Sequence, residues 1–194
     1  MKPVRILTVA LIILAMASTA SAFDGYRKGF VLGGGLGIGP VAKTSVDGFS
    51  GSYDKSGLAM NFLIGYAWDE QNMIVFLRDG ILYSETWEVS FGGVLYFRDK
   101  INIIQGFSGV GYYHYFGPVG KSFFITAGLG AQDWTALDED YDSNDYGAAI
   151  LFGGGYEFAR HVQVYGSVWF GSTSDNFYDY NHSQLMFTVS AVAF

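Results

Sequence analysis

The chain has 194 residues, a formal net charge of −7 and 50% hydrophobic residues. This acidic balance argues against nucleic-acid binding, which requires a basic face. The absence of cysteine excludes disulfides, thiol nucleophiles and cysteine–metal sites. A chain of this length is predicted to form one domain.

Residues 1–22 are typical of a secretory signal peptide. Lys2 and Arg5 precede the apolar run ILTVALIILAMA, and an Ala-Ser-Ala cleavage site ends the segment. The apolar run is shorter than the roughly 20 residues of a membrane-spanning helix, which disfavours the alternative of a membrane anchor. We therefore predict a mature domain of residues 23–194. Its formal net charge falls from −7 to −9, because two positive charges are lost with the signal.

Large apolar residues alternate with small residues along the mature chain, in the period of two that is typical of β-strands. The segments FVLGGGLGIGPV and GLAMNFLIGYAW show this most clearly, with glycine and alanine on the second face. Small side chains suit the inside of a narrow closed barrel, so the large ones are expected to point outward into lipid. The predicted lipid-facing residues are Phe30, Leu32, Leu36, Ile38, Leu58, Met60, Phe62 and Ile64.

These segments predict an all-β fold, a transmembrane antiparallel up-and-down β-barrel. A tilted strand crosses a bilayer in about 9–11 residues, and only helices and closed barrels satisfy every backbone group there. We expect eight strands, with ten as the alternative, and a soluble β-sandwich or lipocalin-like barrel as the alternative class. The nine candidate segments are 29–41, 57–68, 73–84, 86–98, 102–116, 122–134, 146–158, 161–172 and 183–194.

Nine segments conflict with an even strand number, and the conflict lies at 73–84 and 86–98. Either the segment 86–98 begins and ends on the outside, or 73–84 turns back at Asp79-Gly80. Which of the two segments spans the membrane is left open here. Barrels of this kind have long external loops and short periplasmic turns. We predict external loops at 42–56, 135–145 and 172–182, and periplasmic turns at 69–72, 117–121 and 159–161.

Aromatic residues gather near the predicted strand ends, as in the interfacial girdles of membrane barrels. We expect such girdles from Tyr66, Trp68, Tyr96, Phe97, residues 112–116, Trp134, Tyr156, Phe158, Trp169 and Phe170. Four charged residues are predicted to pair inside the lumen and fill it, because eight strands leave little space. They are Arg78, Glu88, Arg98 and Glu157.

A family resemblance covers the whole mature chain. It rests on the glycine-rich strands GFVLGGGLGIG and FITAGLG, the turn GGGYEFARH and the terminal phenylalanine. The chain resembles the small outer-membrane β-barrel families, namely the barrel domain of the outer-membrane protein A type and its eight-stranded relatives. The resemblance implies export through the periplasm to the cell outer membrane. It also implies a monomer with outer-membrane lipids, lipopolysaccharide, periplasmic chaperones and the barrel assembly machinery as partners.

In that family a terminal aromatic residue is read by the assembly machinery. The resemblance carries this assembly signal to Phe194, with Val192 and Met186 in the same phase, and places the terminal ring at a lipid interface. Thr188 and Ser190 interrupt the usual apolar pattern of that phase.

Candidate sites are few. The glycine runs lack nucleotide-binding spacing, and we predict no catalytic residue, cofactor or metal site. His161 is expected in a turn and His114 and His182 at interfaces, although His182-Ser183 leaves a lipid A-modifying enzyme as one alternative function. A solvated acidic external loop is predicted, with divalent bridging to lipopolysaccharide as its alternative role. Its acids are Asp138, Glu139, Asp140, Asp142 and Asp145.

The function predicted from the sequence is structural, or an interaction mediated by the external loops, without catalysis. A narrow channel for ions or small solutes is the other alternative. The loops contain no recognisable ligand motif, so no partner beyond those implied by the resemblance is predicted.

Overall fold

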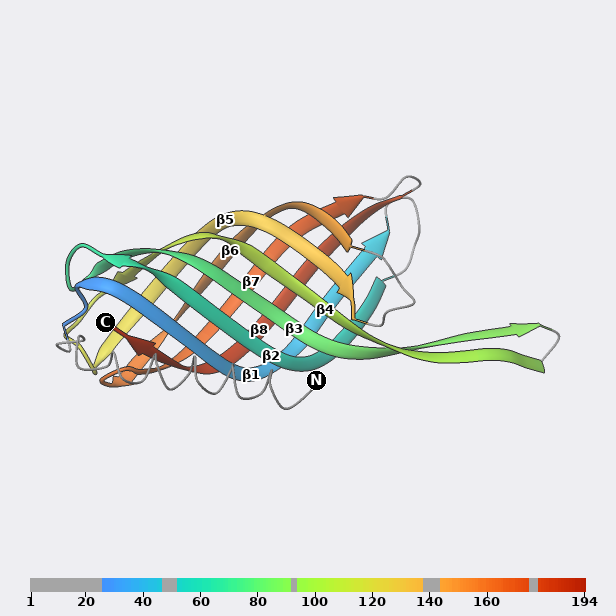
Figure 1. Ribbon diagram of the computed structural model, residues 1–194, viewed down its shortest axis with the longest axis horizontal. Coiled ribbons are helices and arrows are strands. Elements are labelled where there is room, and N and C mark those ends of the chain that lie inside the picture. Colours follow the sequence, from blue (N-terminus) through green and yellow to red (C-terminus); the bar gives the residue numbers. More distant parts are fainter. Residues whose placement is uncertain (1–25, 47–51, 92–93, 138–143, 175–177) are drawn as a thin grey trace, which may run out of the picture.

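The computed structural model describes residues 26–46, 52–91, 94–137, 144–174 and 178–194, and the predicted signal peptide lies outside them. The strands are β1 (Gly29–Val46), β2 (Ser52–Ala67), β3 (Asn72–Phe91), β4 (Val94–Tyr115), β5 (Ser122–Ala136), β6 (Asn144–Ala159), β7 (Val162–Ser174) and β8 (Asp179–Ala193). They form one closed barrel in chain order, and all neighbours are antiparallel, including β1 with β8 (Figure 1). The predicted eight-stranded up-and-down barrel is therefore confirmed. Within the described residues, no helix is long and apolar enough to cross a membrane.

The three short connections β2–β3, β4–β5 and β6–β7 lie at one end of the barrel, as predicted. In the first, the Asp69 carboxylate accepts hydrogen bonds from the backbone N–H groups of Gln71 and Asn72, at 2.8 and 2.7 Å, and from the Asn72 side chain. The Asn72 side-chain hydrogen bond is the main reason why the pKa of Asp69 lies below its ordinary value. An ionised Asp69 thus closes this turn by the side-chain to backbone pattern that favours Asp in turns.

The β3–β4 hairpin resolves the conflict over 73–84 and 86–98. Strand β3 continues without interruption through Asp79-Gly80 to Phe91, and β4 begins at Val94. The expected alternative of a turn at Asp79-Gly80 is wrong, because Asp79 lies inside a continuous ladder in register with Phe107. The segment 86–98 begins and ends outside the barrel and forms the tip of the hairpin, which projects far beyond the rim in Figure 1.

Strand alternation sets which side chains fill the barrel. Inward positions on β1 are Val31 and then glycines, and outward Leu36 and Ile38 are 64% and 63% exposed. All eight residues that we predicted to face lipid lie on the outer face, with Leu32 and Met60 only half-exposed. Their contact with lipid remains a prediction.

Glycine on the inner face of β1 is required by close strand packing. A Cβ atom at Gly37 would lie 1.8 Å from the backbone oxygen of Phe187, and one at Gly35 would lie 2.4 Å from the Ser190 hydroxyl. Any larger residue would therefore push β1 away from β8 and open the ladder that closes the barrel. The space inside is taken instead by large residues of other strands, among them Leu63, Leu77, Phe107, Leu151 and Trp169.

The predicted aromatic girdle is only partly correct. Tyr66, Trp68, Tyr112 and Phe116 are exposed on the outer face near the short-turn end, and Phe158 and Phe170 are exposed as well. The prediction is wrong for Tyr113, Tyr115 and Trp169, because their side chains are on the inner face of their strands and are buried in the lumen. The side chains of Tyr96 and Phe97 lie outside the described residues. Aromatic residues thus fill the barrel as well as surround it.

Candidate functional site

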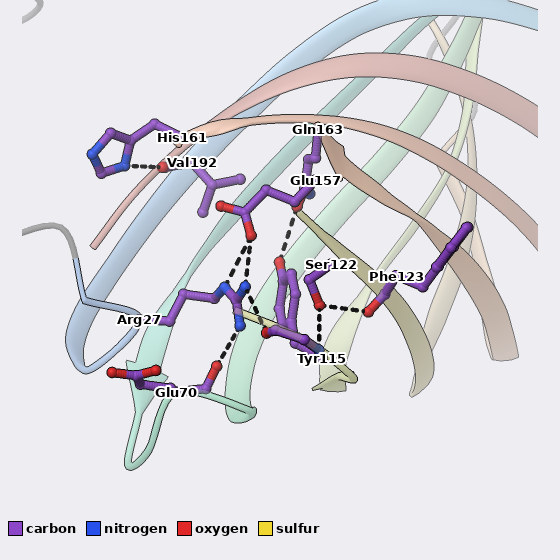
Figure 2. A network of polar contacts seen from close by, with 10 residues as sticks. Arg27, Glu70, Tyr115, Ser122, Phe123, Glu157, His161, Gln163 and Val192 are labelled. Atoms are coloured by element: carbon purple, nitrogen blue, oxygen red, sulfur yellow. Dashed lines mark hydrogen bonds and ion pairs between the residues drawn. The ribbon is translucent and has the colours of Figure 1, made fainter. Parts of the chain in front are cut away.

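The short-turn mouth of the barrel is closed by Arg27, which precedes β1 and is 1% exposed. Its Nε and Nη2 donate to Oε2 of Glu157 on β6 at 3.1 and 2.7 Å. Nη2 also donates to the Gly117 carbonyl at 3.3 Å, and Nη1 donates to the Glu70 carbonyl. The guanidinium carbon lies 3.9 Å from the centroid of the Tyr115 ring. Figure 2 shows Arg27 reaching across the mouth to bind two turns and two strands.

This arrangement confirms Glu157 as a lumen charge that helps to fill the barrel. An ion pair so deeply buried is stable only when further hydrogen bonds satisfy it, and the carbonyls of Glu70 and Gly117 supply these for Arg27. The arginine thus links the start of the barrel to three separate parts of the chain.

A layer of aromatic rings lies beside Arg27 inside the barrel. The Phe124 ring is 5.0 Å from Tyr115, 5.7 Å from Tyr113 and 6.2 Å from Tyr165, measured between centroids. The Tyr165 hydroxyl donates to Oδ2 of Asp79 at 2.9 Å, and the Ser167 hydroxyl donates to the same oxygen at 2.7 Å. Packed rings and a hydrogen-bonded carboxylate therefore occupy the lumen above the mouth.

A buried polar cluster around His182 occupies the lumen toward the long-loop end. Its Nδ1 lies 2.7 Å from the Gln105 amide nitrogen and 3.0 Å from the Thr44 hydroxyl, and its Nε2 lies 2.8 Å from the Thr173 hydroxyl. Gln105 can donate to Nδ1 only if Nε2 carries the proton, so the neutral imidazole donates to Thr173. The interface position predicted for His182 is therefore wrong.

The adjacent His182 and Ser183, which left a lipid-modifying enzyme as an alternative, do not form a Ser–His pair. His182 and Ser183 are consecutive in β8 and point to opposite faces of the barrel. His114 points outward and its Nδ1 lies 2.8 Å from the Asn72 side-chain oxygen, and His161 is in a turn, as predicted. Within the described residues, no three histidine or carboxylate side chains gather to hold a metal ion.

The side chains of the three residues of the predicted assembly signal are on the inner face of the barrel. Met186, Val192 and Phe194 are at most 2% exposed, so the lipid interface predicted for the Phe194 ring is wrong. The outward phase of β8 contains Phe187 and Val189 instead. This phase also accounts for the polar interruptions, because Thr188 and Ser190 face the lumen, where their hydroxyls lie 3.2 Å apart. Recognition of Phe194 during assembly remains a prediction.

Arg78 forms a second ion pair on the outer face, not in the lumen as predicted. Its guanidinium pairs with both carboxylate oxygens of Asp133 on β5 and donates to the Ser108 hydroxyl at 2.9 Å. Gly106 lies between the partners, and a Cβ atom there would be 2.8 Å from Nη1 of Arg78. Arg78 is in register with Ser108, whereas Asp133 is in register with Gly106, two residues nearer the long-loop end. The arginine therefore extends along the outer wall toward that end, as cations within membranes do.

The long-loop end is strongly acidic. The segments 47–56, 84–102, 137–145 and 172–182 contain twelve Asp and Glu residues and three Lys and Arg residues. Within the predicted acidic loop, residues 138–143 lie outside the described residues, so its contacts and any divalent bridging remain untested. Glu88 and Arg98 are in register in the projecting hairpin, outside the barrel, so they do not fill the lumen as predicted.

The projecting hairpin is the candidate functional site. Pairing of β3 with β2 ends at Leu82, and pairing of β4 with β5 ends at Ile103. Just beyond these points, the Leu137 backbone N–H still donates to the Asn102 carbonyl at 2.8 Å, and Lys55 of β2 forms an ion pair with Glu85. Farther out, among the described residues, 87–91 of β3 are in register only with 94–99 of β4. Along 87–91 and 94–99, the outer edges of this two-stranded ribbon have no cross-strand partner within the described part of the chain, a feature that single barrels otherwise avoid.

Comparisons with known proteins agree with this architecture. No protein-family model matches the sequence, and no curated protein is significantly similar to it. Among solved structures, the chain is similar to Neisserial surface protein A, with a TM-score of 0.52 and 14% identity over 84% of this chain and 96% of that one. It is also similar to Ail, the attachment invasion locus protein of Yersinia pestis, in complex with the heparin analogue sucrose octasulfate. For Ail the TM-score is 0.50, with 12% identity over 84% of this chain and 99% of that one.

The fold is therefore that of the small outer-membrane β-barrels, as the resemblance implied. The chain is an all-β, eight-stranded, antiparallel membrane barrel whose lumen is filled and whose β3–β4 hairpin is extended.

Proposed function

We propose that this protein resides in the outer membrane, catalyses no reaction, and binds an extracellular partner through the β3–β4 hairpin. The observation that carries this proposal is the pair of strand edges along 87–91 and 94–99, which have no cross-strand partner on their outer sides among the described residues. An exposed strand edge can accept an extended segment of another chain by main-chain hydrogen bonding, which is an established mode of peptide recognition. Strands this far beyond the barrel rim are not needed to close the barrel.

The filled lumen supports a binding role over the alternative of a narrow channel. Arg27 and Glu157 close the short-turn mouth, and the layer around Phe124 lies behind them. A solute would have to displace a buried ion pair and packed rings in order to pass. Planar-bilayer recordings of the refolded mature chain should therefore show no conductance, whereas stable single-channel steps would favour the channel.

The charge of the loops suggests the chemistry of the partner. Ail was solved with a polyanion, but the long-loop end of this chain has twelve acidic and three basic residues. Like charges repel, so we propose a neutral or cationic partner.

The test shortens the hairpin without altering the barrel. Glu85 and Ile101 are in register, so an Asn-Gly turn that joins them replaces residues 86–100. Bacteria that produce the intact or the shortened protein are compared for adherence to surfaces coated with poly-lysine, neutral dextran or heparin. We expect the intact protein to promote adherence to the first or second surface and the shortened protein to lose it. The matched control keeps the hairpin and changes Asp138, Glu139, Asp140 and Asp142 to amides, which separates hairpin binding from loop charge.

Equal adherence by intact and shortened proteins would refute the role of the hairpin, and adherence to heparin alone would refute a neutral or cationic partner. Orientation is checked in the same cells, because the chain has no cysteine and a single introduced one gives no background. Ser84→Cys should react with an impermeant maleimide, whereas Lys121→Cys in the β4–β5 turn should not. Mass spectrometry of lipid A from these cells tests the alternative of a lipid-modifying enzyme.

A further inference from the structure

The outer wall of the barrel contains an apolar groove of about 870 Å³, which crosses β6, β7, β8 and β1. Its walls include Phe152 of β6, Val168 of β7, Phe187 of β8, and Leu36 and Ile38 of β1. These side chains point outward on the face that a membrane barrel turns toward lipid. The groove therefore lies within the apolar layer of the membrane rather than in water.

The groove exists because two outward positions lack side chains. Gly154 of β6 and Gly166 of β7 are direct partners in the ladder and lie at its floor. A Cβ atom at Gly166 would lie 3.0 Å from the Phe187 ring, closer than ordinary van der Waals contact, so this ring lies against the Gly166 position and forms one side of the depression. Larger residues at neighbouring outward positions raise the walls on both sides.

A single cation lies beyond the long-loop end of the groove on the same face. Leu185 of the groove is in register with Val41, and the next outward pair along β1 and β8 is Lys43 with Ser183. Lys43 is exposed, and none of the ion pairs among the described residues includes it. Its other cross-strand neighbour, Asp54 of β2, is the nearest acid by register and weakens the local positive charge.

We propose that the groove and Lys43 together bind a phosphorylated lipid of the outer leaflet, with one acyl chain over Gly154 and Gly166 and a headgroup phosphate at Lys43 and Ser183. The mostly apolar lining suits a hydrocarbon chain. A lysine about two residues, or roughly 7 Å of strand, beyond the groove is placed for an anionic headgroup.

The test measures how much lipid A the refolded mature protein retains in detergent, by native mass spectrometry. Lys43→Gln should lower the retained fraction several-fold without affecting folding, because Lys43 is exposed. Gly166→Leu pushes a side chain into the groove against the Phe187 ring and should lower retention as well. Asp54→Asn removes the competing acid and should raise retention.

The matched control is Gly80→Leu, another outward glycine on β3, where a Cβ atom would have no neighbour closer than 3.9 Å. This variant should retain lipid A like the unaltered protein. The unaltered protein should retain lipid A without its phosphates as poorly as Lys43→Gln retains intact lipid A. Free phosphate at equal concentration should not compete. Equal retention by the unaltered protein, Lys43→Gln and Gly166→Leu would overturn the proposal, as would a dimer that appears without lipid and is lost in Gly166→Leu. The inference does not depend on the hairpin, so either result leaves the proposed function to its own test.

Discussion

The ring of His161, in the β6–β7 turn, packs against the ring of the terminal residue Phe194, with their centroids 4.8 Å apart. Two hydrogen bonds join the same regions: the backbone N–H of Val192 donates to the His161 carbonyl at 2.9 Å, and Nδ1 of His161 lies 2.9 Å from the Val192 carbonyl. His161 adopts a φ of 69°, which turns the chain so that these contacts form. The end of the chain is thus held by β1 on one side and by this turn on the other.

Replacing Phe194 by Ala should destabilise the barrel by about 3 kcal/mol, because a buried aromatic side chain is lost. His161→Gly keeps the left-handed backbone available but removes the ring and its hydrogen bond, so it should cost less. Urea unfolding in lipid vesicles measures both free energies. If Phe194 is also read in assembly, only Phe194→Ala should lower the amount in the outer membrane beyond its loss of stability. Equal cellular losses for the two variants, scaled to stability, would make Phe194 a packing residue alone.

Breaking the ion pair at the mouth should be costlier than removing it whole. Arg27→Met leaves the Glu157 carboxylate buried without its cation and should destabilise by about 3–5 kcal/mol, whereas Arg27→Met with Glu157→Met should cost clearly less. The heat-dependent gel shift and urea unfolding report the difference. Neither variant should conduct ions, because the rings around Phe124 still fill the lumen. Conductance in Arg27→Met would show that the arginine alone seals the barrel.

Breaking the Arg78–Asp133 ion pair on the outer face should also cost more than removing both of its charges. Asp133→Ala leaves Arg78 without its partner on the outer wall and should destabilise by about 2 kcal/mol, less if the guanidinium reaches the headgroups. Arg78→Leu with Asp133→Leu removes both charges and should be neutral or stabilising. A double-mutant cycle in vesicles gives the coupling energy. No coupling between the two positions would contradict the pairing.

The two faces of β1 should respond to substitution for different reasons. Leu36→Arg places a charge on the lipid face and should cost about 2–4 kcal/mol in a bilayer. Gly37→Ala adds one methyl group against the Phe187 backbone and should cost about 1–3 kcal/mol or more. Gly80→Ala, outward on β3 and with no neighbour closer than 3.9 Å to its Cβ, is the control and should change stability by less than about 0.5 kcal/mol. Tolerance of both Leu36→Arg and Gly37→Ala would mean that the assigned faces are wrong.

The period of two was sufficient to predict the barrel and its faces. Leu36 and Gly37 differ so strongly in size that their phase could be read directly from the sequence. Alternation carries no information on where a strand leaves the membrane, so 86–98 could not be recognised as the tip of a hairpin. The part of β3 that belongs to the barrel wall is set by its pairing with β2, which ends at Leu82.

Side-chain chemistry misled the sequence reading wherever residues of one kind occur on both faces. Tyr112 and Tyr113 are adjacent and aromatic, yet one is exposed and the other fills the lumen. Arg78 was assigned to the lumen because charge normally avoids lipid, and its partner Asp133 is 55 residues away and could not be inferred. Arg27 was missed because it precedes the first strand pattern, although the basic pair Arg27-Lys28 just before a barrel strand was a usable signal.

Once this barrel has inserted, its orientation is effectively permanent. The segments at the long-loop end contain twelve carboxylates. Every one of them must cross the hydrocarbon layer if the protein is to reverse its orientation in the membrane. Each charge in that layer costs several kcal/mol on its own, so the barrier to reversal far exceeds the marginal stability of a folded domain. The short-turn end, with its small hydrogen-bonded turns, has no comparable barrier. The direction of insertion is therefore decided once, by which end crosses while the strands are still pairing.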